Sequence, residues 1–323
     1  MNLRPALLRI AGALCLMGSS FAGSAQDVTR YTGRCDASAA IALDAEHFAV
    51  ANDEVDTLSI YRRGVATPSA AISLSHFLGT PASQESDIEG AAAIGTRVYW
   101  ITSHGRNSKG KHQPSRHRIF ATEVRPGQTP TLEPLGTPYV HLLRDLEATE
   151  ALRPYQLGRA AKLAAEADGG LNIEGLAATP SGQLLIGFRN PLPGRRALIV
   201  PLENPTEIIE GMRARLGSPI ELDLGGRGIR SIELIDSTYL IVAGPTGDNG
   251  TFAVFRWSGK PTDVAVALSG VDLQGLRPEA LFAVPNSARV QLLSDDGGVL
   301  IGGVECKSLP ATQQAFRSLT VAR

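Results

Sequence analysis

Residues 172–190 read NIEGLAATPSGQLLIGFRN, and this stretch determines how the rest of the chain is interpreted. Glu174 precedes a short apolar run, a turn of small and polar residues follows, and a second apolar run ends in Phe-Arg-Asn. The runs are too short for ordinary helices and contain β-branched and aromatic residues, which favours two strands joined by a tight turn. A charged side chain at the head of a strand that otherwise looks buried requires a partner or a function.

The same pattern recurs along the chain, which is the signature of a repeat protein. Each copy has a glutamate, an apolar run, a turn, a second apolar run and a polar loop. The copies begin at Asp36, Asp87, Asn172, Ile229 and Arg277. We align them by their glutamates, which are Glu89, Glu174, Glu233 and Glu279, with Ser38 in the corresponding place of the first copy. The alignment of Glu233 requires a turn about two residues shorter than in the other copies.

Further strands follow most copies. The third strands are LSIYRR, HRIFATEV, RALIVPL and FAVFRW, and the fourth are AAISL, TLEPL, PIELDL and VAVAL. Repeats with up to four strands each are typical of radial β-sheet arrays. We therefore predict an all-β fold, a β-propeller of five blades. Six blades are the alternative, because the long interval between the second and third copies leaves room for another blade.

The excess residues in that interval are assigned instead to a helical insertion near residues 140–168. This segment is rich in Ala, Leu, Arg and Glu and poor in β-branched residues, as helices are. Residues 204–217 are a second, shorter helix candidate, with Pro205 near its start.

The two ends of the chain are predicted to share the fifth blade. The last copy shows three strands, and DVTRYTG, just before Cys35, supplies the fourth and closes the ring, which removes a free sheet edge. Cys35 and Cys306 are the two cysteines that remain after the N-terminal segment is removed, and closure of the ring brings them towards each other. We predict a disulfide between them; the alternative is two separate buried thiols.

The N-terminal segment has the features of a secretory signal. Residues 1–25 contain Arg4 and Arg9, a short apolar core and small residues before the predicted cleavage point. Residues 26–323 then form a single β-propeller domain, exported to the periplasm or secreted. No later segment reaches the roughly 18 apolar residues of a membrane span. A formal net charge of −1 gives no reason to expect a nucleic-acid partner, and the sequence does not fix the oligomeric state.

If the repeats are blades, polar residues from every copy surround one end of the central channel. Alternation along a strand places each glutamate and the residue two before it on the same side. Loops 52–54, 103–111, 188–190, 244–250 and 294–297 return to the same face, where functional loops usually gather. The sequence therefore predicts a site at the channel mouth.

Each residue of the predicted site has a chemical reason to be there. Carboxylates can transfer protons or hold a hard cation such as Ca²⁺, and arginine, histidine and amide groups can bind an anionic ligand. The predicted catalytic residues are Glu89, Glu174, Glu233 and Glu279. The predicted anion-binding residues are His104, Arg106, Arg189, Asn190 and Arg277, and the predicted metal ligands are Asp87, Glu89 and Glu174.

Three functions fit this arrangement. The first is a metal-assisted hydrolase of small anionic esters, and the second is a propeller that binds a ligand or an unknown protein without turnover. The third is a structural protein, in which the glutamates only hold neighbouring blades together through arginines and backbone amides. Nucleophile elbows, Walker A loops, dinucleotide fingerprints and H-E-x-x-H motifs are absent from the sequence, so no familiar catalytic signature selects one function.

Several long motifs occur in an order that resembles the bacterial family called domain of unknown function 3616. They include DIEGAA, YWITSHGRNSKGK, NIEGLAATPSGQLLIGFRNP, YLIVAGPTGDNGTFAVFRWSG and RPEAL. This resemblance covers nearly the whole chain after the signal segment, and it implies a β-propeller without an established activity. The D-x-E-G start of the blades is also similar to exported esterase-like and phytase-like propellers. That looser likeness implies ester or phosphoester hydrolysis, with Ca²⁺ in the phytase-like case, although a dense Asp-rich cluster is missing here.

Overall fold

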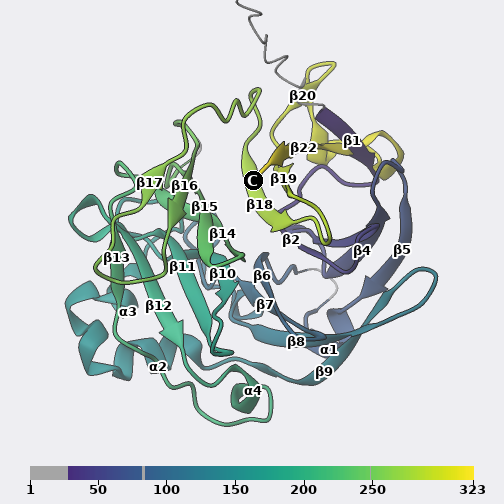
Figure 1. Cartoon of the computed structure of the whole chain (residues 1–323). Coiled ribbons are helices and arrows are strands. Elements are labelled where there is room, and N and C mark those ends of the chain that lie inside the picture. Colours follow the sequence, from purple (N-terminus) through teal and green to yellow (C-terminus); the bar gives the residue numbers. More distant parts are fainter. Residues whose placement is uncertain (1–27, 82–83, 248) are drawn as a thin grey trace, which may run out of the picture.

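The strands of the computed structural model form a ring of five four-stranded antiparallel sheets, seen along its axis in Figure 1. The structure describes residues 28–81, 84–247 and 249–323. The predicted all-β propeller with five blades is confirmed, and within the described residues no sixth four-stranded sheet is present. The signal-peptide prediction for residues 1–25 lies outside the described residues.

Each of the first four blades uses four consecutive strands. The first strands of neighbouring blades contact one another around a closed ring, so they line the central channel. Blade 1 contains β2 (Ala39–Ala42), β3 (His47–Ala51), β4 (Thr57–Arg62) and β5 (Pro68–Ser73). Blade 2 contains β6 (Ile88–Ile94), β7 (Arg97–Thr102), β8 (Ile119–Arg125) and β9 (Thr131–Tyr139). Blade 3 contains β10 (Asn172–Ala178), β11 (Leu184–Asn190), β12 (Ala197–Leu202) and β13 (Ile220–Leu222). Blade 4 contains β14 (Gly228–Ile235), β15 (Thr238–Gly244), β16 (Ala253–Trp257) and β17 (Val266–Ala267).

The fifth blade joins the two ends of the chain, as predicted. It contains β18 (Pro278–Ala283), β19 (Arg289–Ser294) and β22 (Ala315–Ala322), and its outer strand is β1 (Val28–Thr32), which pairs antiparallel with β22. A small separate hairpin, β20 (Leu300–Ile301) with β21 (Val304–Glu305), precedes β22. The predicted disulfide between Cys35 and Cys306 is present beside this closure, with its Cα atoms 5.9 Å apart.

Removing this disulfide should lower the free energy of unfolding by about 2–4 kcal/mol, because the bond constrains a long loop in the unfolded chain. The two cysteines are 271 positions apart. The measurement is urea denaturation of the Cys35→Ser/Cys306→Ser variant, followed by the fluorescence of the buried Trp100 and Trp257. Wild-type protein treated with a reductant is the control and should show the same loss; an unchanged midpoint would contradict the prediction.

The helical insertion predicted near residues 140–168 lies between blades 2 and 3. It consists of α2 (Leu142–Ala148), a 3₁₀ segment (Glu150–Tyr155) and α3 (Leu157–Ala160), and its leucines pack into the core between those blades. The helix predicted near Pro205 is one turn, α4 (Pro205–Ile208), with proline at its first position. The other helical segments are α1 (Ser75–Leu78) and 3₁₀ turns at Pro114–Arg116, Pro193–Arg195, Cys306–Ser308 and Ala311–Gln313. Among the described helices, none is long and apolar enough to cross a membrane.

The core is divided into five hydrophobic clusters, one between each pair of neighbouring blades. The glycine after the glutamate in the repeat lets the inner strands approach one another. A Cβ atom on Gly175 would lie 2.7 Å from Ile229 Cγ2 of the next blade and 3.0 Å from Gly187 Cα. A Cβ on Gly90 would lie 3.2 Å from the Glu174 carbonyl oxygen. In the repeat, the glutamate therefore supplies an acidic group at the channel mouth, and the glycine that follows it allows neighbouring blades to pack closely.

Candidate functional site

A β-bulge near the start of four inner strands directs one side chain from each strand into the channel mouth. In β6, Ile88 and Gly90 pair with the consecutive residues Thr102 and Ile101, which leaves Glu89 outside the regular register. Equivalent shifts in β10, β14 and β18 release one residue each. A bulge re-aims the extra side chain. The released residues, Glu89, Glu174, Arg230 and Glu279, all line one cavity.

The predicted position of Glu233 is wrong. Glu233 pairs with Leu240 in the regular part of β14 and does not line the cavity, while Arg230 occupies the place that Glu89 holds in its own blade. Ile229, which precedes Arg230, pairs with Ala243, and Ile88, which precedes Glu89, pairs with Thr102. The two partners are equally far apart in the sequence, so the Arg230 copy needs no shortened turn. The alignment failed because it required a glutamate in every copy; spacing alone identifies Arg230.

The cavity at the channel mouth has a volume of about 480 Å³ and is strongly polar. All five loops that the repeat brought to this face contribute to its wall. Its eight acidic residues are Asp53, Glu54, Asp87, Glu89, Glu166, Glu174, Glu279 and Asp295. Its six basic residues are Arg106, Arg116, Arg189, Arg230, Arg277 and Lys307. The acidic and basic side chains are unevenly distributed, so the cavity has two chemically different sides.

On one side, Glu174 is paired with two arginines. Its Oε1 accepts hydrogen bonds from Asn172 Nδ2 and Arg189 Nη1, both at 2.9 Å, and its Oε2 lies 2.8 Å from Arg230 Nε. Arg230 also forms an ion pair with Glu279. Because these residues come from blades 3, 4 and 5, Arg230 joins three blades at the channel mouth. Glu174 and Arg189, which both belong to blade 3, form an ion pair in the wall of the cavity.

On the other side, three carboxyl groups share fewer positive partners. Asp53, Asp87 and Glu89 each place an oxygen within 4.8 Å of the other two, so Asp53 takes the place that the prediction gave to Glu174. Asp87 pairs with Arg116 Nη1 at 2.9 Å. Glu89 is only 8% exposed, and within the described residues it makes no hydrogen bond or ion pair. This side of the cavity therefore has more acidic groups than basic partners.

Burial, together with the neighbouring carboxylates, raises the pKa values of these carboxyl groups. Burial, followed by the neighbouring carboxylates, raises the pKa of Glu89 well above its ordinary value. Burial raises the pKa of Asp53 to about 8, and it raises that of Asp87 to about 6 although Arg116 opposes the shift. Burial and a hydrogen bond with Asp295 likewise raise the pKa of Asp36 to about 9. Carboxyl groups that retain protons for lack of positive charge are suited to a divalent cation.

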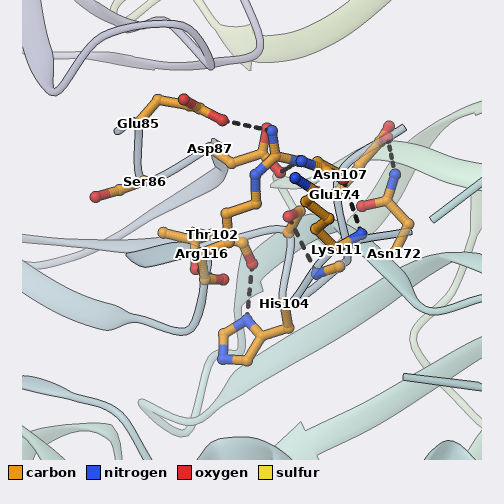
Figure 2. A network of polar contacts seen from close by, with 12 residues as sticks. Glu85, Ser86, Asp87, Thr102, His104, Asn107, Lys111, Arg116, Asn172 and Glu174 are labelled. Atoms are coloured by element: carbon orange, nitrogen blue, oxygen red, sulfur yellow. Dashed lines mark hydrogen bonds and ion pairs between the residues drawn. The ribbon is translucent and has the colours of Figure 1, made fainter. Parts of the chain in front are cut away.

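Two of the predicted anion-binding residues do not reach the cavity. His104 is 1% exposed, its Nδ1 lies 2.8 Å from the Thr102 carbonyl oxygen, and Figure 2 shows its ring directed away from Asp87 and Glu174. Burial, with His117 as the next cause, lowers the pKa of His104 to about 3, so it carries no charge for an anion. Asn190 donates from its amide to the carbonyl oxygens of residues 165 and 167 and fixes the insertion instead. The loop was identified correctly, but these side chains turn away from the mouth.

The three predicted arginines line the cavity in different states. Arg106 donates from Nε to the Ala161 carbonyl oxygen and from Nη1 to that of Gly110, which holds the loops in place. Arg189 is engaged by Glu174 and, at 3.0 Å, by Glu166. Arg277 is exposed, and in the described part of the chain its side chain forms no ion pair. Arg277 is therefore the cation most available to a ligand.

Sequence reasoning did not single out Asp53, Asp295 or Lys307. Asp53 and Asp295 lie in two of the predicted loops, so the signal that locates them is the position of those loops in the repeat. Lys307 follows the disulfide residue Cys306 and lies 3.4 Å from Glu54. Because the segment around Lys307 is outside the repeat, no periodic signal marks it.

Comparisons with known proteins give one family model that matches part of the chain and several solved structures that are similar to it. Residues 139–289 match the model of a family described as "Protein of unknown function (DUF3616)", which confirms the resemblance over that segment. Solved structures that are similar include the Myxococcus xanthus glutaminyl cyclase, at 12% identity and a TM-score of 0.46, covering 91% of this chain and 95% of that one. Another is a putative oxidoreductase (glucose dehydrogenase) from Thermus thermophilus, at 12% identity and a TM-score of 0.45, covering 92% of this chain and all of that one. No curated protein sequence matches the chain.

Proposed function

We propose that the channel mouth binds a divalent cation at Asp53, Asp87 and Glu89, and that a small anionic ester is hydrolysed beside it. The observation that carries this proposal is Glu89, a buried carboxylate without a partner among the described residues, close to two further carboxylates. An unpaired buried charge is expensive, so such a group either keeps its proton or binds a cation. A purely oxygen-based ligand set favours Ca²⁺ or Mg²⁺.

The rest of the cavity is suited to an anionic ligand. A volume of about 480 Å³ accommodates a small molecule, and Arg277 can form charge-assisted hydrogen bonds with a phosphate or carboxylate group. A bound cation would supply Lewis-acid polarisation of the ester. Glu89 would hold the cation, whereas Glu174 and Glu279 would keep the arginines in position.

We also propose that the protein is exported to the periplasm or secreted, as the N-terminal segment suggests. The disulfide between Cys35 and Cys306 supports this, since disulfides persist in oxidising compartments.

Replacing Glu89 with glutamine should abolish cation binding and turnover together. The wild-type protein is expected to bind calcium or magnesium and to hydrolyse a member of a panel of phosphomonoesters, phosphodiesters and carboxylic esters. In the Glu89→Gln variant, cation affinity should fall by at least about 100-fold, and the melting temperature should stay equal or rise because an uncompensated carboxylate is removed. Calorimetry, elemental analysis and the substrate panel measure these effects.

The matched control is Glu233→Gln, because Glu233 lies outside the cavity and should leave cation binding and turnover unchanged. Equal cation affinity in the Glu89→Gln variant and the wild type would contradict the proposed site.

A ligand-binding propeller without turnover is the second candidate. The observation that favours it is the pairing of Glu174 and Glu279 with arginines, which leaves fewer free carboxylates for proton transfer. Cation binding with no hydrolysis across the panel would select this function. Inorganic phosphate is then the probe, and Arg277→Gln should weaken its binding to the cation-loaded protein by about tenfold, as expected for the loss of one charged hydrogen-bond partner.

A further inference from the structure

A second group of metal-ligating side chains lies outside the channel mouth, on the loop between β7 and β8. The ring centroids of His104 and His117 are 5.3 Å apart, and those of His117 and His112 are 5.1 Å apart. His104 is buried, His117 is half-buried and His112 is exposed. The three imidazoles therefore form a path from the interior to the surface.

His104 has a free acceptor nitrogen inside the protein. Its Nδ1 faces the Thr102 carbonyl oxygen at 2.8 Å, the dashed contact in Figure 2, and a carbonyl can only accept, so Nδ1 carries the proton. Nε2 then presents a lone pair, yet this atom is buried and has no hydrogen-bond partner in the described part of the chain. Histidines that bind metals usually donate their other N–H to a carbonyl or carboxylate in this way. A ligand that accepts this lone pair would satisfy Nε2.

The backbone holds His104 and His117 in position without a ligand. The His104 amide donates to the Arg116 carbonyl oxygen at 2.9 Å, next to His117 in the chain. Thr102 Oγ1 accepts from the Arg118 amide at 2.8 Å, on the other side of His117. His104 also adopts a positive φ of 55°, a conformation that non-glycine residues adopt rarely. Two imidazoles are thus preorganised on paired backbone segments.

The spacing of the rings fits one shared metal ion. Metal–nitrogen bonds of about 2.0–2.1 Å in a tetrahedral site place the centroids of two ligating imidazoles about 5 Å apart. Both observed centroid distances agree with this value. The nitrogens of all three histidines are not yet within 4.8 Å of one another, so the exposed His112 has to turn inward to complete the set.

We propose that His104 and His117, completed by His112, bind a transition-metal ion such as Zn²⁺, Ni²⁺ or Cu²⁺. Imidazole nitrogen is a preferred ligand of these ions, whereas the carboxylates of the channel mouth suit Ca²⁺ or Mg²⁺. The two sites therefore select different metals, and this one is independent of the proposed hydrolytic function.

The test is a zinc titration of tag-free protein by calorimetry with a competing chelator, supported by the absorption spectrum of the cobalt-loaded protein. The wild type should bind one zinc ion at these histidines. His117→Gln should weaken binding by at least about tenfold, and so should His104→Asn, in which asparagine tolerates the positive φ. His76→Gln, on the exposed surface of α1, is the matched control and should bind zinc as the wild type does.

Two results would overturn the proposal. One is the absence of zinc binding to the wild type, and the other is unchanged zinc affinity in His117→Gln, a half-buried position where circular dichroism can verify the fold. Glu89→Gln separates this site from the channel mouth, because it should lose calcium or magnesium and retain zinc. Loss of zinc in Glu89→Gln with retention in His117→Gln would assign zinc to the carboxylates instead.

Discussion

Replacing Arg230 with methionine should lower the free energy of unfolding by about 3–5 kcal/mol, the usual effect of removing one partner from a buried ion pair. The Arg230 guanidinium pairs with Glu174 at 2.8 Å and with Glu279, and all three side chains are more than nine-tenths buried. Methionine retains much of the side-chain volume, so the loss reports on charge more than on packing. Glu279 would be left without its ion-pair partner, and Glu174 would retain Arg189.

Urea denaturation of the variant and the wild type measures this loss. The Arg230→Met/Glu279→Gln double variant should recover part of the stability, because it removes the carboxylate that the first substitution leaves unpaired. Arg215→Met is the matched control: it breaks an exposed pair with Glu207 and should change stability by less than about 1 kcal/mol. A loss for Arg230→Met no larger than for Arg215→Met would show that the arginine does not hold the blades together.

The importance of Arg230 also shows where sequence reasoning succeeded and where it stopped. The strands of the blades follow from apolar runs and turns, which are local features of the sequence. Counting those strands left one position open in the last blade, and the strand before Cys35 fills it as β1. The disulfide then follows from closure, because both cysteines flank the shared blade.

The side chains of the site depend on features that local patterns do not contain. A β-bulge changes the register of two paired strands by one residue, and it is this shift that points Glu89 and Arg230 into the cavity. The orientation of His104 depends on a backbone hydrogen bond within its loop. Asp53 and Glu89 belong to blades 1 and 2, so their proximity depends on how neighbouring blades pack, which the sequence of either blade alone does not contain. The repeat could therefore predict the loops of the site but not every side chain in it.

Raising the pH from about 5 to about 9 in the presence of a chelator should lower the free energy of unfolding by on the order of several kcal/mol. A carboxyl group with a raised pKa holds, in the folded protein, a proton that the unfolded chain has already released. Its contribution to stability is fully present below about pH 4 and is lost as the pH rises towards the folded pKa. That pKa is about 6 for Asp87, about 8 for Asp53 and about 9 for Asp36. Each additional proton in the native state contributes a slope of about 1.4 kcal/mol per pH unit.

A divalent cation should flatten this dependence, because it binds the ionised carboxylates and replaces the protons as the source of positive charge. The measurement is urea denaturation at about pH 5, 7 and 9 with a chelator and with excess calcium. Asp53→Asn should reduce the slope in the chelator, since the variant has no titrating group at that position. The exposed Asp223→Asn is the control, because the new amide oxygen can still accept from the Gly225 amide and the slope should not change. If calcium leaves the pH dependence of the wild type's stability unchanged, the carboxyl groups at the channel mouth keep their protons and do not bind a cation. The proposed metal-dependent hydrolysis would then lack its metal site.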